Sequence, residues 1–275
     1  MTPSIWSCIY HKLPLHEALR SLAAEGWNAS EIGTEHLVAI ETGDDPARLT
    51  DLAVQAIAET RMDCPQAHAF LAANVAQPDR DAAEADRDHL MRHLLLSRRL
   101  GARNVVMHPG RRRGVTTRAE QQEVRRLNRE AFRRLGDRAG EEGMLVCLEN
   151  LMTRGVETAA DMLDLLDDID HPAVALTLDT SHAHASGLDV AATTRALGGK
   201  IAALHISDNN RSGDQHLAPG SGNIDWPAFM QALRDTGYTG ILNLEIPGER
   251  HSVPGIQRLK LDHARRVAEW LASPA

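Results

Sequence analysis

The amino-acid sequence predicts a single (β/α)8 TIM barrel over residues 1–275, with its active site at the carboxyl ends of the strands. The chain has 275 residues, close to the ~250 typical of such barrels. Eight short apolar segments alternate with longer amphipathic segments, a pattern typical of parallel strands joined by right-handed crossovers. An open, doubly wound sheet is the alternative, but residues 10–14 (YHKLP) lack the glycine-rich turn expected after its first strand.

Each expected strand is a short apolar or β-branched run that ends where polar residues begin. In chain order, the expected strands cover residues 5–10, 29–33, 61–70, 104–108, 144–150, 174–179, 201–207 and 241–246. Each is followed by a segment rich in Ala, Leu, Arg and Glu with helical spacing of its apolar residues. These expected helices cover residues 14–25, 45–60, 79–100, 118–142, 159–168, 189–197, 226–236 and 255–272.

The composition narrows the classes of partner and compartment. The net charge of −8 argues against a nucleic-acid partner, which would favour a basic chain. The longest apolar runs are the size of strands, so no membrane partner is expected. Residues 1–6 lack the basic and apolar regions of a secretion signal, and the three cysteines give no disulfide framework. A cytoplasmic protein is therefore expected.

Chemically active side chains stand at the ends of most expected strands. Because the strand ends of a barrel converge on one mouth, we expect these side chains to meet there. They are Glu31, His68, His108, Glu149, Asp179, His205, Asp208 and Glu245. Buried carboxylates cost several kcal/mol unless they are paired or bound to metal. A divalent cation is the expected shared partner, and mixed carboxylate and imidazole ligands suit Mn, Zn, Co or Fe.

Within this set, Glu149, Asp179, His205 and Glu245 are the strongest candidate metal ligands, because each ends a different strand. His68 and His108, taken singly, are also compatible with a structural role. Histidines in expected helices and loops are interpreted as surface residues: His11, His16, His89, His93, His171, His251 and His263.

Two further segments allow more than one interpretation. Arg111, Arg112 and Arg113 follow a strand end, where they either extend a solvated helix face or meet an anion. Gly220, Ser221 and Gly222 form either a plain loop or a backbone cradle for a phosphate.

Six sequence motifs resemble the xylose isomerase-like TIM-barrel superfamily, the sugar phosphate isomerase/epimerase family to which endonuclease IV is related. The motifs are EIGTEHL at 31–37, LEN at 148–150, LDTSHA at 178–183, HISDN at 205–209, DQHLAPGSGNIDW at 214–226 and LEI at 244–246. They follow the order expected along the barrel and extend through nearly the whole chain.

The resemblance implies roles for individual residues. Glu149 and Glu245 would bind the metal and act as the acid/base pair on opposite faces of a sugar, and Asp179 and His205 would complete the metal site. His68, His108, His182 and Arg211 would contact the substrate. In endonuclease IV, the positions matching His68, His108, His182, Asp214 and His216 help to build a three-zinc cluster. The resemblance thus implies one tight divalent metal site and is compatible with two or three.

The expected function is that of a divalent-metal-dependent isomerase or epimerase of a sugar or sugar derivative. Paired glutamates would transfer a proton at a carbon adjacent to a carbonyl. A metal-dependent lyase or dehydratase acting on a keto-sugar is one alternative. An endonuclease IV-like abasic-site phosphodiesterase is the other. The expected partner is a small sugar, and a homo-oligomer is compatible with the sequence.

Overall fold

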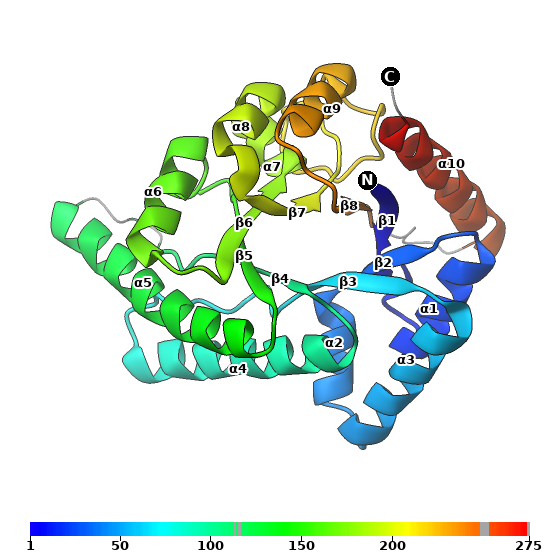
Figure 1. Ribbon diagram of the computed structural model, residues 1–275, viewed down its shortest axis with the longest axis horizontal. Helices are drawn as coiled ribbons and strands as arrows, with labels where there is room; N and C mark the ends of the chain where they lie inside the picture. The colour runs from blue at the N-terminus through cyan, green and yellow to red at the C-terminus, as the bar shows by residue number, and fades with distance from the viewer. Residues whose placement is uncertain (113, 115–116, 154, 248–252, 274–275) are drawn as a thin grey trace.

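The computed structural model describes all residues except 113, 115–116, 154, 248–252 and 274–275. The described strands are β1 (Thr2–Trp6), β2 (Ala29–Ile32), β3 (Asp63–His68), β4 (Asn104–Met107), β5 (Leu145–Glu149), β6 (Val174–Asp179), β7 (Ile201–His205) and β8 (Ile241–Leu244). They form one parallel sheet in the order β7-β6-β5-β4-β3-β2-β1-β8. The Ile206 amide donates to the Asn243 carbonyl (2.8 Å) and the Ile206 carbonyl accepts from the Glu245 amide (3.0 Å), which joins β7 to β8. The predicted (β/α)8 TIM barrel is confirmed (Figure 1).

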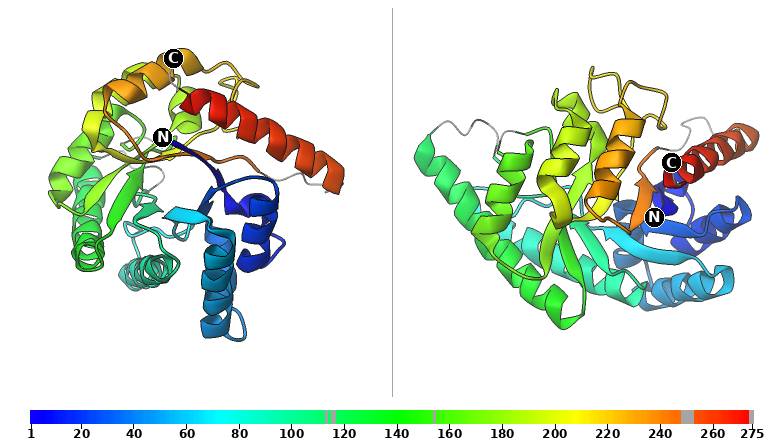
Figure 2. Two further views of the ribbon diagram at one scale, coloured as in Figure 1. Left: turned by 45° about the vertical axis from the view of Figure 1, so that its right-hand side comes forward. Right: turned by 45° about the horizontal axis from the view of Figure 1, so that its top comes forward.

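Helices surround this sheet, as the two views of Figure 2 show. The expected ones are present as α1 (Leu15–Ala24), α3 (Pro46–Thr60), α4 (Arg80–Arg99), α5 (Arg118–Glu141), α6 (Ala159–Ile169), α8 (Val190–Leu197), α9 (Trp226–Asp235) and α10 (Pro254–Ala272). Two short helices, α2 (Thr34–Glu41) and α7 (Thr180–Ala185), were not expected and follow β2 and β6 directly. Among the described helices, none is long and apolar enough to cross a bilayer.

The first strand lies earlier in the chain than predicted. It covers Thr2–Trp6, and Ser7–Tyr10 form a 3-10 helix where the sequence indicated a strand to residue 10. The Ser7 hydroxyl accepts a hydrogen bond from the Gly33 amide (2.9 Å) and contacts His36 Nδ1 (2.9 Å). These bonds to the segment after β2 hold the chain in a turn, so the apolar run of Cys8 and Ile9 is buried without belonging to the sheet.

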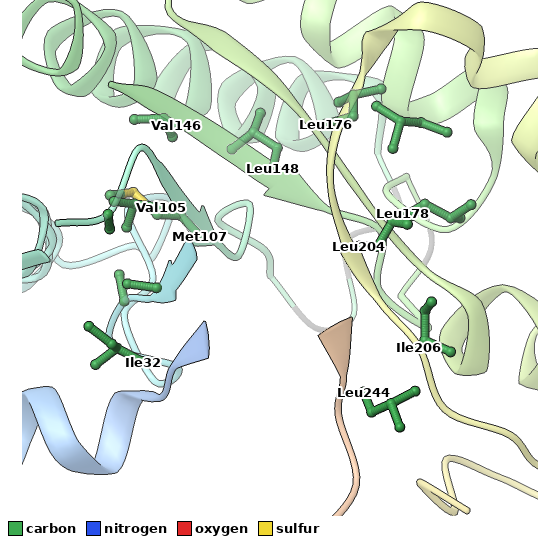
Figure 3. Close-up of a cluster of buried hydrophobic side chains, with 14 of the residues drawn as sticks. Ile32, Val105, Met107, Val146, Leu148, Leu176, Leu178, Leu204, Ile206 and Leu244 are labelled. Atoms are coloured by element: carbon green, nitrogen blue, oxygen red, sulfur yellow. The ribbon is translucent and has the colours of Figure 1, made fainter. Parts of the chain in front are cut away.

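Strand alternation separates the apolar core from the polar interior of the barrel. Val146 and Leu148 of β5 join the large apolar cluster between sheet and helices, whereas Cys147 packs with Val106 and Ala203 in a separate small cluster. Figure 3 shows side chains of the large cluster, among them Leu176, Leu178, Leu204 and Leu244. Because side chains alternate along a strand, the residue after each outward leucine turns inward. This period of two places Glu149, Asp179, His205 and Glu245 inside the mouth of the barrel.

A long loop after β7 is organised by Asp208, whose side chain is fully buried. Its Oδ2 accepts hydrogen bonds from the Gly220 amide (2.9 Å), the Gly222 amide (3.0 Å) and Trp226 Nε1 (3.0 Å). Its backbone pairs with Leu217. The Asp208 carboxylate thereby ties the later part of the loop back to the segment that follows β7.

We expect Asp208→Ala to lower the free energy of unfolding by about 2–4 kcal/mol, because several buried N–H donors lose their acceptor. Urea unfolding of the metal-free protein measures this. Asp225→Ala, which removes the N-cap bond to the Ala228 amide at the start of α9, is the matched control and should cost about 1 kcal/mol. Equal losses in the two variants would contradict the role given to Asp208.

Candidate metal centre

Four buried side chains from four strand ends converge at the mouth of the barrel. Glu149, Asp179, His205 and Glu245 each present one ligand atom, and these atoms lie within 4.8 Å of one another. His205 Nδ1 lies 3.4 Å from Glu149 Oε1 and 3.1 Å from Glu245 Oε2. Ligand atoms held ~2.1 Å from one ion are separated by about 3.0–3.4 Å, so these two distances suit a shared cation.

The polar atoms facing this point lack other partners. Asp179 Oδ2, His205 Nδ1 and Glu245 Oε2 are buried and make no hydrogen bond to any described residue. Asp179 uses its other oxygen, Oδ1, to cap α7 by accepting the His182 amide hydrogen (2.7 Å). Buried polar atoms are normally satisfied, and three carboxylates with one imidazole form a donor set for Mn, Zn, Co or Fe. The four residues therefore fit a divalent cation.

Glu31 orients the imidazole of this group. Its Oε2 lies 2.9 Å from His205 Nε2 and also accepts from Gln66 Nε2, and both acid and imidazole are fully buried. With Nε2–H donating to Glu31, the lone pair of Nδ1 faces Glu149 and Glu245. This carboxylate–histidine arrangement is common behind metal ligands. The sequence placed Glu31 at a strand end but did not indicate that it would support His205, and Gln66 was missed.

Two histidines extend the centre on the side of β3 and β4. His68, His108 and Glu149 form a second group that could hold a metal ion. His68 Nε2 lies 3.2 Å and His108 Nε2 3.4 Å from Glu149 Oε2. His68 Nδ1 is 2.8 Å from the Ala69 carbonyl, so Nδ1–H donates there. Nε2 faces Glu149 Oε2, to which it donates when the ring is protonated and beside which it can bind an ion when the ring is neutral. Glu149 thus belongs both to this group and to the four-residue group.

A third set lies toward solvent. Asp214 Oδ2 contacts His182 Nε2 (3.3 Å) and His216 Nε2 (2.9 Å). The other nitrogen of His182 lies 3.3 Å from Glu149 Oε1, and that of His216 lies 2.9 Å from the Glu245 carbonyl. The Asp214 and His216 side chains are 22% and 26% exposed, against 2% for Glu149. These residues form the accessible rim of the centre.

Burial and mutual contact shift the acid–base equilibria strongly. Burial raises the pKa of Asp179 to about 7. Burial alone would also raise the pKa of Glu149 and Glu245, but His205 and other imidazoles hold the pKa of Glu149 well below its usual range and that of Glu245 at about 2. Burial opposes protonation of His205, yet Glu245, Glu31 and Glu149 raise its pKa well above the usual value. Without a metal ion, the centre thus favours ionised Glu149 and Glu245 beside a protonated His205.

The remaining predicted residues lie in different surroundings. Arg211 is exposed, and its Nε donates to His184 Nε2 (3.0 Å) instead of facing the four-residue group. Asp208 faces the loop after β7 and is not among the residues grouped as candidate ligands. The amides of Gly220 and Gly222 donate to Asp208, so they do not form an open phosphate cradle.

His93 was interpreted as a surface residue, but its side chain is fully buried, because α4 packs it toward α2. In the arginine segment at 111–113, Arg112 Nε donates to the Ala76 carbonyl. Arg113 and His251 lie outside the described residues.

Comparison with known proteins identifies the family. Residues 19–273 match the family model described as xylose isomerase-like TIM barrel, so the chain belongs to that family. It is 31% identical over 122 residues to an L-ribulose 3-epimerase of Methylomonas sp., covering 42% of this chain and 40% of that protein. It is 30% identical over 129 residues to an inosose dehydratase of Lacticaseibacillus casei, covering 41% of this chain and 43% of that protein. The chain thus spans less than half the length of these relatives.

A solved structure extends the likeness to the whole fold. A D-tagatose 3-epimerase-like protein superposes with a TM-score of 0.79 at 22% identity, covering 99% of this chain and 100% of the other. At this identity, the likeness concerns the fold.

We expect Glu31→Gln to weaken divalent metal binding about 10–100-fold, because Gln cannot hold the proton of His205 on Nε2 as a carboxylate does. Isothermal titration of the metal-free protein with Mn²⁺ measures the affinity. Glu35→Gln, on the exposed face of α2, is the matched control and should bind as the wild type does. Unchanged affinity in a folded Glu31→Gln protein would show that Glu31 does not position this ligand.

Proposed function

We propose that this protein is a divalent-metal-dependent isomerase or epimerase of a sugar or sugar derivative. The observation that carries the proposal is the placement of Glu149 and Glu245. They come from β5 and β8, which lie on opposite sides of β6 and β7 in the closed sheet, and both approach His205 Nδ1. Two ionised carboxylates facing one point from different directions suit removal and return of a proton at carbon.

The proposed chemistry begins with a C–H bond adjacent to a carbonyl. Glu149 or Glu245 accepts the proton, and the other glutamate returns one to the opposite face, which is epimerisation, or to the neighbouring carbon, which is isomerisation. Glu149, Asp179, His205 and Glu245 would hold the cation. A bound divalent cation supplies the positive charge that stabilises the developing negative charge on the sugar oxygens. His182 on the accessible rim would orient hydroxyl groups, with His68 and His108 as further substrate contacts.

The relatives support this class of chemistry without fixing the substrate. An epimerase and a dehydratase both match this chain, and both reactions are compatible with proton abstraction beside a carbonyl. We therefore infer a small sugar or polyol ketone, cyclic or open-chain, as the substrate. From the sequence, we also propose that the protein is cytoplasmic. Loss of water after the same first step is the outcome that would make the protein a dehydratase.

A specific observation also favours a second candidate. The groups around Glu149 and Asp214 bring His68, His108, His182 and His216 to the same centre. Clustered metal ions are suited to phosphodiester hydrolysis, because they can activate water and stabilise the leaving oxygen. The net charge of −8 opposes approach to a nucleic-acid backbone. The number of tightly held ions distinguishes the two candidates.

After loading with Mn²⁺ and dialysis against a weak chelator, we expect one tightly held ion per chain by elemental analysis. Asp179→Asn should lose it because one of the four ligands is weakened, and His216→Gln should keep it. Two or three ions in the wild type, with one lost in His216→Gln, would instead assign the outer groups as metal sites and favour phosphodiester chemistry.

In deuterated water, the metal-loaded protein should incorporate deuterium beside the carbonyl of at least one ketose, aldose, sugar acid or polyol ketone. Glu149→Gln and Glu245→Gln should each lower that exchange at least 100-fold, since proton transfer by a positioned group typically contributes about 10²–10⁴ in rate. Mass spectrometry and NMR measure the exchange. Glu130→Gln, on the exposed face of α5, is the control and should exchange normally. Nicking of an abasic-site duplex without exchange in any sugar would overturn the proposal.

A further inference from the structure

A separate cluster of potential metal ligands lies on the outer wall of the barrel, between α2 and α4. Glu41 is the last residue of α2, and His89 and His93 lie one helical turn apart on α4. Residues four apart on a helix project from the same face, so both imidazoles turn toward α2, which lies beside α4 in Figure 1. This cluster shares no residue with the centre at the barrel mouth.

The ligand atoms of the cluster converge on one carboxylate oxygen. Glu41 Oε2 lies 2.6 Å from His89 Nε2 and 3.3 Å from His93 Nε2. The shorter distance is that of a hydrogen bond, which must lengthen to about 3.0–3.4 Å when both atoms bind one ion. The imidazole centroids are 4.6 Å apart with their planes at 85°. One ligand atom from each of the three residues falls within 4.8 Å of the others. Two imidazoles and a carboxylate form a donor set that Zn²⁺, Co²⁺, Ni²⁺ and Cu²⁺ accept.

Neighbouring side chains hold these ligands in place. The ring of Phe70 stacks on His89 with centroids 4.3 Å apart and planes at 29°. Arg92 Nε donates to Glu41 Oε1 (2.6 Å), which leaves Oε2 turned toward the two imidazoles. Supporting contacts of this kind orient ligands before an ion arrives. The guanidinium charge also opposes a cation, so we expect weaker binding here than at the four-residue centre.

The cluster is accessible to an incoming ion. His89 and Glu41 keep about a fifth of their side chains exposed. A surface groove of about 300 Å³, lined in part by Glu41, His93 and Arg92, leads to the cluster and has room for metal-bound water.

We propose that Glu41, His89 and His93 form a second divalent transition-metal site, of the Zn²⁺ class, that joins α2 to α4 on the outside of the barrel. The site is independent of the proposed sugar chemistry. By linking two helices, bound metal stabilises the barrel wall next to the segment that follows His68. Saturation at about 100 times the dissociation constant should raise the melting temperature by about 5 °C.

The test is a titration of the metal-free, full-length protein with Zn²⁺ alone, read by calorimetry and thermal melting. We expect the wild type to bind one more ion per chain than His89→Gln or Glu41→Gln. The Asp179→Asn protein should lose the central ion but keep the outer one, so a failure of the central site remains distinguishable. His171→Gln is the matched control, since His171 Nε2 also lies beside a single carboxylate, Asp137 (3.1 Å).

Circular dichroism checks that each variant is folded. His89 is replaced instead of His93, because a substitution at the fully buried His93 would disturb the packing of the helices more. Deuterium exchange into the sugar substrate should be unchanged in His89→Gln. Equal zinc stoichiometry and equal melting shifts in the wild type, His89→Gln and Glu41→Gln would overturn the proposal and leave a hydrogen-bonded cluster. An equal loss of zinc in His171→Gln would also overturn it, because binding would then reflect any surface histidine.

Discussion

The cost of burying like charges at the mouth of the barrel is the constraint on which the site depends. Glu31, Glu149, Asp179 and Glu245 are all buried, and His205 is the one imidazole among the described residues that touches three of them. Such a set is stable only with compensating positive charge. In the metal-free centre a protonated His205 supplies this charge. A bound divalent cation would supply it instead, because His205 must give up the Nδ1 proton to act as a ligand. The buried carboxylates that require this positive charge therefore also favour the binding of a metal ion.

The scaffold meets this constraint by dividing each strand between two environments. Outward leucines and valines pack under the helices, and the alternate positions carry Cys147, Ala203 and Val106 into a narrow interior. Small side chains below the mouth leave the large polar ones to fill its upper end. Rigid strands thus fix Glu149 and His205, whereas loops supply the outer rim through Asp214 and His216.

Asp208 shows how the two regions are connected. Its carboxylate accepts hydrogen bonds from amides on the far side of the loop after β7, and so ties the later part of the loop back to the segment that follows β7. Asp208 thus serves the backbone, although it lies three positions after the candidate ligand His205 in the sequence. Asp179 combines both tasks, because one oxygen caps α7 and the other faces the cluster.

The sequence by itself determined the barrel and the four-residue group. Eight alternating segments define the order of the strands, and the alternation of side chains along a strand turns the residue after an outward leucine into the mouth. Only the tertiary structure decided the rest, because it depends on contacts between distant segments. Glu31 meets His205 across 174 positions, the turn at Ser7 is fixed by Gly33 and His36, and Glu41 reaches His89 only because α2 packs on α4. Local patterns indicate which way a side chain faces, but long-range packing selects its partner.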